Sequence, residues 1–171
     1  VPSNLPNQQM LEENLGKPLT QIPDPFEKEE SFGLYMNNKL CEFLDQFGFA
    51  YEFVSSTNEY KSGKFNKALE NLCKNYDIIK NLVANTLGEE RRAHYSPLMP
   101  ICPASGKVLE QGVLEVDAEK FTIRFEDAAG KQHEIYVGDG NCKLQWKADF
   151  GMRWHALDVD YEMYGKDIIP S

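Results

Sequence analysis

The sequence is poor in cysteine and contains no long apolar segment. Its four cysteines lie far apart and include no C-x-x-C pair, a pattern that favours neither a disulfide framework nor a metal cage. No apolar run approaches the ~18 residues that a membrane helix needs, so we expect no membrane partner. A reducing, cytoplasmic setting fits both observations.

Basic residues are also in deficit. With 18 Lys and Arg against 27 Asp and Glu, the formal net charge is -9, so no general attraction draws the chain to RNA phosphates and any such contact must be local. The first residue is Val1, and the first ten residues contain no basic segment leading into an apolar one. We therefore expect the start to be a cut within a longer protein, with no signal peptide.

The first half of the chain alternates between helical and extended patterns. Prolines make residues 1–26 mostly extended and turning, and only Gln9–Leu15 could form a short helix there. The Ser31 hydroxyl can then cap a helix that Gly48 ends. The aromatic and β-branched residues 51–54 predict a strand. A second long helix is predicted from the apolar stripe over residues 65–88. This alternation is typical of a layered α/β domain with parallel strands.

The hydrophobic period changes to two near Leu98. Short apolar runs separated by glycine-containing turns predict a small antiparallel β insert over residues 98–142. Beyond it, the pattern predicts a strand at 143–147, a helix at 149–157 and a strand at 159–163. We therefore divide the chain into segments 1–97, 98–142 and 143–171.

Both tryptophans of the chain lie close to one acid. Trp146 and Trp154 flank Asp149 in sequence, and aromatic walls with a carboxylate suit an alkylammonium ligand through cation–π contact and charge pairing. The alternative is that both tryptophans are core residues while Asp149 and Arg153 form an i,i+4 helix pair.

Two further clusters are candidate sites. Gly165 and Asp167 end a predicted strand, where open α/β sheets bind ligands, and Asp167 could accept a hydrogen bond from a ribose hydroxyl. The same residues are also common turn formers. Arg91 and Arg92 could contact a phosphate backbone, or they could form a solvated helix end. The three histidines lack a second ligand at metal spacing, so no metal site is predicted.

The order of several segments resembles a known family. Together they resemble class I lysyl-tRNA synthetase in its bacterial form, from one end of the chain to the other. The segments that carry this resemblance are Val1–Gln8, Ile22–Phe26, Glu30–Phe32, Leu87–Arg92, Lys143–Lys147, Met152–Trp154 and Asp160–Asp167.

The resemblance implies a fold and an activity. It implies a partial Rossmann-like parallel sheet: residues 1–97 as the first half of the catalytic domain, 98–142 as a β-rich connective insert and 143–171 as the start of the second half. The family's two ATP-binding motifs, of the types His-Ile-Gly-His and Lys-Met-Ser-Lys-Ser, are absent from this sequence. We therefore expect the chain alone to be inactive, and the complete enzyme to activate lysine with ATP and Mg²⁺ and transfer it to tRNA(Lys).

The resemblance also implies roles for individual residues. It places Trp146, Asp149 and Trp154 around lysine, and Gly165 and Asp167 against ATP. Arg91 and Arg92 are the tRNA-binding candidates that come from the residues themselves. No catalytic residue is assigned.

The sequence departs from the family at several positions. Phe150 replaces a tryptophan of many relatives and Ile168 replaces a histidine, which changes the expected polarity of the pocket. Archaeal relatives have an insert similar to a zinc ribbon, whereas Cys102 and Cys142 here offer at most two thiolates, too few for a tetrahedral site. We expect no zinc.

Two other classes of function stay open. The chain could be a non-catalytic relative that binds lysine or a tRNA acceptor stem, or a purely structural piece. An incomplete Rossmann-like sheet would also leave unpaired strand edges, so self-association is plausible.

Overall fold

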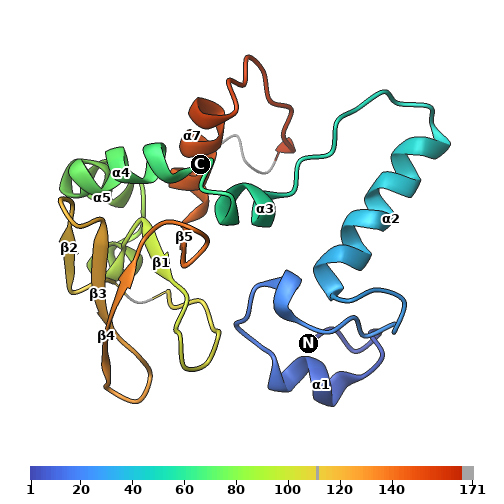
Figure 1. Ribbon diagram of the computed structural model, residues 1–171, viewed down its shortest axis with the longest axis horizontal. Helices are drawn as coiled ribbons and strands as arrows, with labels where there is room; N and C mark the ends of the chain where they lie inside the picture. Colours follow the sequence, from blue (N-terminus) through green and yellow to red (C-terminus); the bar gives the residue numbers. More distant parts are fainter. Residues whose placement is uncertain (111, 167–171) are drawn as a thin grey trace. The chain divides into compact units, whose positions relative to one another are not determined.

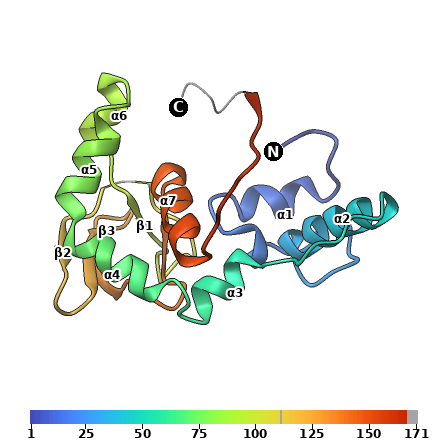
Figure 2. The same ribbon diagram turned by 90° about the horizontal axis from the view of Figure 1, so that it is seen from above.

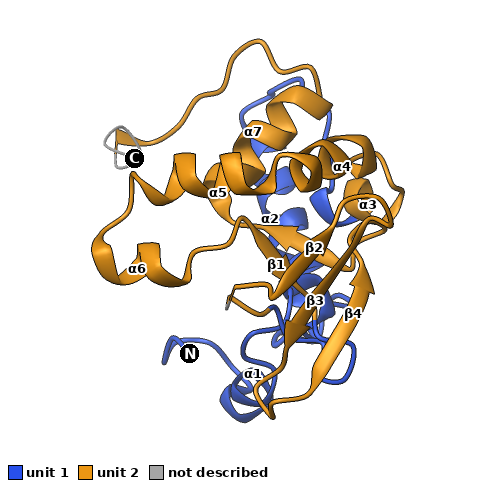
Figure 3. Ribbon diagram, turned by 90° about the vertical axis from the view of Figure 1, so that its left-hand side faces the viewer, with its two compact units in different colours: residues 1–57, 102–108 blue, residues 58–101, 109–171 orange. Residues whose placement is uncertain are grey.

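The computed structural model describes residues 1–110 and 112–166 (Figure 1). The chain divides into two compact units, coloured separately in Figure 3. Unit 1 contains residues 1–57 and 102–108, and unit 2 contains residues 58–101 and 109–171. Since unit 2 takes residues from all three segments distinguished by sequence, the division at 97/98 and 142/143 is not a division into compact units and stays a prediction.

Unit 1 is helical, with little regular structure between its helices. The predicted cap of its longest helix is confirmed, because the Ser31 hydroxyl accepts a hydrogen bond of 3.1 Å from the Leu34 amide. Gly48 follows that helix with a φ of 69°, the left-handed conformation common after helix ends. The elements are α1 (Gln8–Glu13), the 3₁₀ helix η1 (Leu19–Gln21), α2 (Phe32–Gln46) and the start of α3 (Ser56–Lys61).

Two expectations for the first half were wrong. Residues 51–54 form no strand, because no neighbouring segment pairs with their backbone. The long helix expected over 65–88 is two helices, α4 (Asn66–Lys74) and α5 (Tyr76–Ala84). The break lies at Asn75, whose side-chain amide donates to the Asn71 carbonyl over 2.9 Å and thereby competes with the helical ladder.

Unit 2 contains two small antiparallel sheets (Figure 1). In the first, Leu98 lies opposite Leu144, so the segment between the two strands, residues 101–141, begins and ends at the same sheet. The second is a three-stranded meander in the order β2-β3-β4. The predicted antiparallel insert is therefore confirmed. The strands are β1 (Leu98–Pro100), β2 (Glu115–Asp117), β3 (Thr122–Glu126), β4 (Gln132–Tyr136) and β5 (Cys142–Leu144).

The strand expected at residues 159–163 is absent, and residues 159–165 lie outside regular structure. All strand pairs within residues 1–110 and 112–166 are antiparallel. The parallel sheet expected from the alternation of helix and strand is therefore not formed by this part of the chain. Residues 51–54 and 159–163 have no strand partner, and the strand predicted at 143–147 overlaps β5, which pairs antiparallel with β1.

Helix α7 (Trp146–Ala156) packs against α4, α5 and β5 (Figure 2). It begins three residues before the predicted helix. Leu69 of α4, Met152 of α7 and Phe125 of β3 belong to one buried cluster. Sheet and helices thus share one core in unit 2, and this core holds α7 in place.

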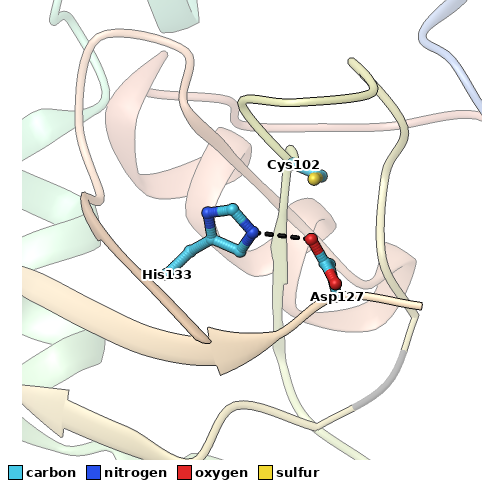
Figure 4. A group of neighbouring side chains, drawn as sticks. All are labelled: Cys102, Asp127 and His133. Atoms are coloured by element: carbon cyan, nitrogen blue, oxygen red, sulfur yellow. Dashed lines mark hydrogen bonds and ion pairs between the residues drawn. The ribbon is translucent and has the colours of Figure 1, made fainter. Parts of the chain in front are cut away.

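The turn between β3 and β4 is organised by Asp127 (Figure 4). Its Oδ1 accepts hydrogen bonds from the Ala129 and Lys131 amides, at 2.9 and 3.0 Å. Its Oδ2 lies 2.7 Å from Nε2 of His133, whose ring stacks on Phe125 with centroids 5.4 Å apart. The bond to His133, together with the backbone donors, lowers the pKa of Asp127. His133 therefore helps to hold the Asp127 side chain within this turn.

No helix in the described part of the chain is both long enough and apolar enough to span a bilayer. The remaining helix of unit 2, α6 (Glu89–His94), follows α5 and carries the two adjacent arginines.

Candidate functional site

The tryptophans of α7 form an aromatic row with Phe150. Residues four apart lie on one helix face, so Trp146, Phe150 and Trp154 follow one another along α7. The Trp146 and Phe150 rings meet edge to face at 5.5 Å, and the Phe150 and Trp154 rings are parallel at 5.9 Å. Each tryptophan is 44% exposed, so neither is the core residue of the alternative interpretation.

Asp149 lies on the neighbouring face of α7 and has two protein partners. Its Oδ2 pairs with the Arg153 guanidinium at 2.6 Å, which confirms the i,i+4 pair. Its Oδ1 accepts a hydrogen bond of 2.7 Å from the Tyr60 hydroxyl of α3. Burial, reinforced by the Asp149 charge, raises the pKa of Tyr60 far above its usual range, so this hydroxyl remains a donor.

The carboxylate of Asp149 is therefore partly satisfied before any ligand arrives. Each carboxylate oxygen can accept two hydrogen bonds, so acceptor capacity remains beside the aromatic row. Arg153 also has an unused hydrogen-bond donor, because its Nε is buried and, within residues 1–110 and 112–166, has no hydrogen-bond partner. An ammonium group could thus bind by sharing Asp149 with Arg153 or by displacing it.

The segment after α7 turns back along the helix. The Val159 amide donates to the Trp154 carbonyl at 3.0 Å, and the Trp154 indole N–H donates to the Glu162 carboxylate. Gly165 lies in this segment, and a Cβ added there would meet nothing within 4 Å. The backbone at Gly165 is therefore open to a ligand, whereas Asp167, its predicted partner, lies outside the described residues.

The two arginines of α6 differ in what they contact. Arg92 donates from Nε to the Ala84 carbonyl at 3.2 Å and from Nη2 to the Leu87 carbonyl at 3.1 Å. It thereby satisfies carbonyls at the end of α5, as basic side chains near helix C-termini often do. Arg91 instead lines a pocket together with Trp146. Of the two arginines predicted from sequence, Arg92 therefore makes a structural contact and Arg91 lines a pocket.

This pocket of about 430 Å³ lies between the end of α5, the α6 region and the start of α7. It brings Arg91 and Trp146 together, whereas Asp149, Trp154 and Gly165 do not line it. Its lining residues are Val83, Leu87, Arg91, His94, Tyr95, Glu110, Gln145, Trp146 and Lys147.

Sequence reasoning missed the contact of Tyr60 and the unpaired hydroxyl of Tyr95. Tyr60 lies 89 positions from Asp149, and no local pattern links the two residues. Tyr95 is 8% exposed, and its hydroxyl is buried without a hydrogen-bond partner among the described residues. A tyrosine beside an arginine pair was visible in the sequence, but its unpaired hydroxyl depends on tertiary packing.

The whole chain is similar to one enzyme family. The family described as tRNA synthetases class I (K) matches residues 1–171. The lysine–tRNA ligase of Rickettsia felis is 57% identical over 167 residues, which are 98% of this chain and 32% of that protein. The lysine–tRNA ligases of Rickettsia africae and Rickettsia typhi are 56% and 54% identical over the same shares. The chain therefore spans about a third of the length of these relatives.

Proposed function

Because this chain belongs to the class I tRNA synthetases (K), we propose that it is part of a lysine–tRNA ligase, which activates lysine with ATP and transfers it to tRNA(Lys). The observation that carries the proposal is similarity along almost the entire chain to proteins named lysine–tRNA ligase, with 54–57% identity in three of them. The exposed aromatic row beside a carboxylate supports an amine substrate.

The proposed lysine contacts are Trp146, Asp149 and Trp154. The tryptophan faces would cover the alkyl stem and attract the ammonium, while Asp149 would supply the opposite charge. Tyr60 would hold the Asp149 carboxylate in position, since the hydroxyl bonds one of its oxygens. Arg153 would move away from Asp149 when the ammonium binds.

ATP, together with Mg²⁺, and tRNA are the other proposed substrates. Gly165 and Asp167 are the proposed ATP contacts, with Gly165 allowing close approach of the backbone. Arg91 and Arg92 are the proposed tRNA contacts, although the guanidinium of Arg92 already bonds two carbonyls. Most adenylation chemistry is positioning and charge stabilisation, so the chain without its ATP-binding motifs would be inactive.

Other parts of the complete enzyme would supply what this chain lacks. We propose that they carry the two ATP-binding motifs and complete a Rossmann-like parallel sheet. Segments 1–97, 98–142 and 143–171 would keep their proposed roles, and the insert with Cys102 and Cys142 would need no zinc. The enzyme would act in the cytoplasm, where self-association through strand edges also remains a proposal.

The first test is the sequence of the gene on both sides of this segment. Both ATP-binding motifs should flank it, and the complete protein should charge tRNA(Lys) with lysine. Asp149→Asn should raise the KM for lysine about tenfold or more, a loss of about 1.4 kcal/mol in binding that is ordinary for a charge-assisted contact.

The control is Glu119→Gln, which neutralises an exposed carboxylate of the β2–β3 turn and should leave the KM unchanged. Start and stop codons that closely enclose the segment would instead support the non-catalytic alternative, in which the chain binds lysine or an acceptor stem. Unchanged lysine kinetics in Asp149→Asn would contradict the proposed lysine site.

A further inference from the structure

The apolar stripe of residues 65–88 is only partly covered by the chain itself. On α4 it is buried, since Leu69 and Leu72 lie in the core of unit 2. On α5 it is not, because Ile78 and Leu82 are 68% and 70% exposed. These two residues are four positions apart, so they lie on one face of the helix. The stripe that predicted a single buried helix therefore leaves an apolar face of α5 open among the described residues.

This face of α5 lines a groove together with α4 and α7, all within unit 2 (Figure 3). The groove has a volume of about 510 Å³. Its lining on α7 runs from Lys147 to His155, which is ~12 Å of helix at 1.5 Å per residue. Gly151 lies in the middle of this wall, and a Cβ added there would meet nothing within 4 Å. A second backbone could therefore approach α7 closely at this point.

The openness of the groove indicates what kind of occupant it fits. Drug-sized ligands usually lose roughly 70–90% of their surface in a concave pocket. Ile78 and Leu82 instead remain largely exposed, so the groove is too shallow to enclose such a ligand. Amphipathic helices dock in apolar grooves through side chains three or four positions apart. The groove and its helical walls therefore fit a helix.

The charge of the groove narrows the chemistry of that helix. Lys147 and His155 are the ionisable residues among its described lining residues, and neither is acidic. The Lys147 ammonium donates to the Thr86 hydroxyl at 2.8 Å, and an ammonium group can donate three hydrogen bonds. A carboxylate of the occupant could accept another of them. The groove is therefore complementary to an apolar helix edged with acidic side chains.

We propose that the groove between α4, α5 and α7 binds an amphipathic helix from the part of the complete protein that lies outside this chain. Apolar side chains of that helix would cover Ile78 and Leu82, and an acidic side chain would pair with Lys147. The inference goes beyond the proposed function but rests on it for the existence of this further part.

The length of the relatives supports this occupant. The matched residues make up 32% of the Rickettsia felis ligase, so about two thirds of a protein of that kind lies outside a chain like this one. A helix joined covalently to the groove has a high effective concentration, so a contact of modest intrinsic strength is sufficient to hold it. Large exposed apolar patches are also uncommon on soluble proteins unless a partner covers them.

The test measures the reactivity of a thiol placed in the groove. Leu82→Cys is made in a Cys41→Ser background, because Cys41 is the least buried of the four cysteines. The 171-residue chain and the complete protein encoded by the gene are each treated briefly with N-ethylmaleimide, and mass spectrometry quantifies the labelled peptide. Labelling should be at least about tenfold slower in the complete protein, because a covered site reacts only when it opens locally.

The matched control is Lys131→Cys in the same background, in the exposed turn between β3 and β4, which should be labelled at the same rate in both proteins. Lys147→Glu, added to Leu82→Cys in the complete protein, should speed labelling because it opposes an acidic helix with a like charge. Lys147→Met, which removes the charge but keeps an apolar side chain, should have a smaller effect. Circular dichroism melts of each variant show whether it is folded.

Photoleucine, incorporated in place of leucine, identifies the occupant. Irradiation of the complete protein should join position 82 to a segment outside residues 1–171 of the same molecule, with acidic residues beside apolar ones. A cross-link to a second copy, seen as a doubled mass, would overturn the proposal. Equal labelling of Leu82→Cys in the two proteins, or a gene that encodes only these 171 residues, would also overturn it. Labelling unchanged by Lys147→Glu would reject the acidic helix.

Failure of this inference can be told apart from failure of the proposed function. Lysine charging by the complete protein, together with equal labelling of Leu82→Cys in the two proteins, would reject the helix-binding groove alone. Protection of the groove in a complete protein that does not charge tRNA(Lys) would reject the proposed function and leave the groove as an interface within that protein.

Discussion

The position of Asp149 depends on a residue from a different helix. Tyr60 reaches it from α3, with its own ring packed edge to face on Phe65 at 4.9 Å. Since the Tyr60 side chain is buried, its hydroxyl has little access to water. The Asp149 carboxylate is therefore its main hydrogen-bond partner. This contact fixes one carboxylate oxygen, and Arg153 holds the other.

Tyr60→Phe should therefore destabilise the chain while preserving its core packing. Losing a buried hydrogen bond to a carboxylate is expected to cost about 1–2 kcal/mol in free energy of unfolding. Urea unfolding followed by tryptophan fluorescence would measure it. Tyr136→Phe is the matched control, because the Tyr136 ring is 41% exposed and forms a T-shaped pair with the Phe121 ring. Equal stability of the two variants would contradict a structural role for the bond.

At the scale of elements, α2 packs closely against η1 at Gly33. A Cβ on Gly33 would lie 2.7 Å from the Thr20 methyl and 2.8 Å from the Thr20 backbone nitrogen. Side chains can move away from such a contact, but the backbone of η1 cannot do so without shifting the whole turn. The close approach of these two elements therefore requires glycine at this position.

Gly33→Ala should weaken unit 1 by about 1–3 kcal/mol, the usual cost of overpacking. The matched control is Gly151→Ala in α7, where an added Cβ meets nothing within 4 Å. That variant should raise stability by about 0.5–1 kcal/mol, because alanine loses less backbone entropy in a helix. Helical circular dichroism against urea would measure both. A stabilised Gly33→Ala chain would show that α2 and η1 do not pack this closely.

Elements with local signals were predictable, and those that depend on distant partners were not. The hydroxyl of Ser31 and the period of two after Leu98 are local, and both predictions were confirmed. Residues 51–54 have strand-forming side chains but no pairing partner, and Asn75 interrupts a stripe that continues on both sides of it. The aromatic row follows from helical spacing, whereas Tyr60 and the unpaired Tyr95 hydroxyl emerge only from packing.

For the whole molecule, the large buried cluster belongs to unit 2 alone. Its members include Leu69, Ile123 and Met152, whereas the buried apolar residues of unit 1 among those described are few, such as Leu11 and Ile22. Burial of apolar surface is the main stabilising contribution in folding. The two units should therefore differ in local stability.

Amide hydrogen exchange, measured by peptide, should show this difference. We expect backbone amides of α2 to exchange at least about tenfold faster than those of α4, equivalent to a difference of about 1.4 kcal/mol in opening free energy. Helices of different units are compared at one pH and temperature. Equal protection of α2 and α4 would indicate that the chain opens as one cooperative unit.

The pairing of β1 with β5 has an evolutionary consequence. The two strands hold the ends of the intervening segment, residues 101–141, together, and the Ile101 amide donates to the Asn141 carbonyl at 2.9 Å. A short turn could therefore replace this segment without moving its ends. Ile123 and Phe125, however, lie in the same core as α4 and α7. A lineage that deleted this segment would keep the β1–β5 pair but would lose part of the core around α4 and α7. Such a loss would be inherited only with simultaneous repacking of the helices.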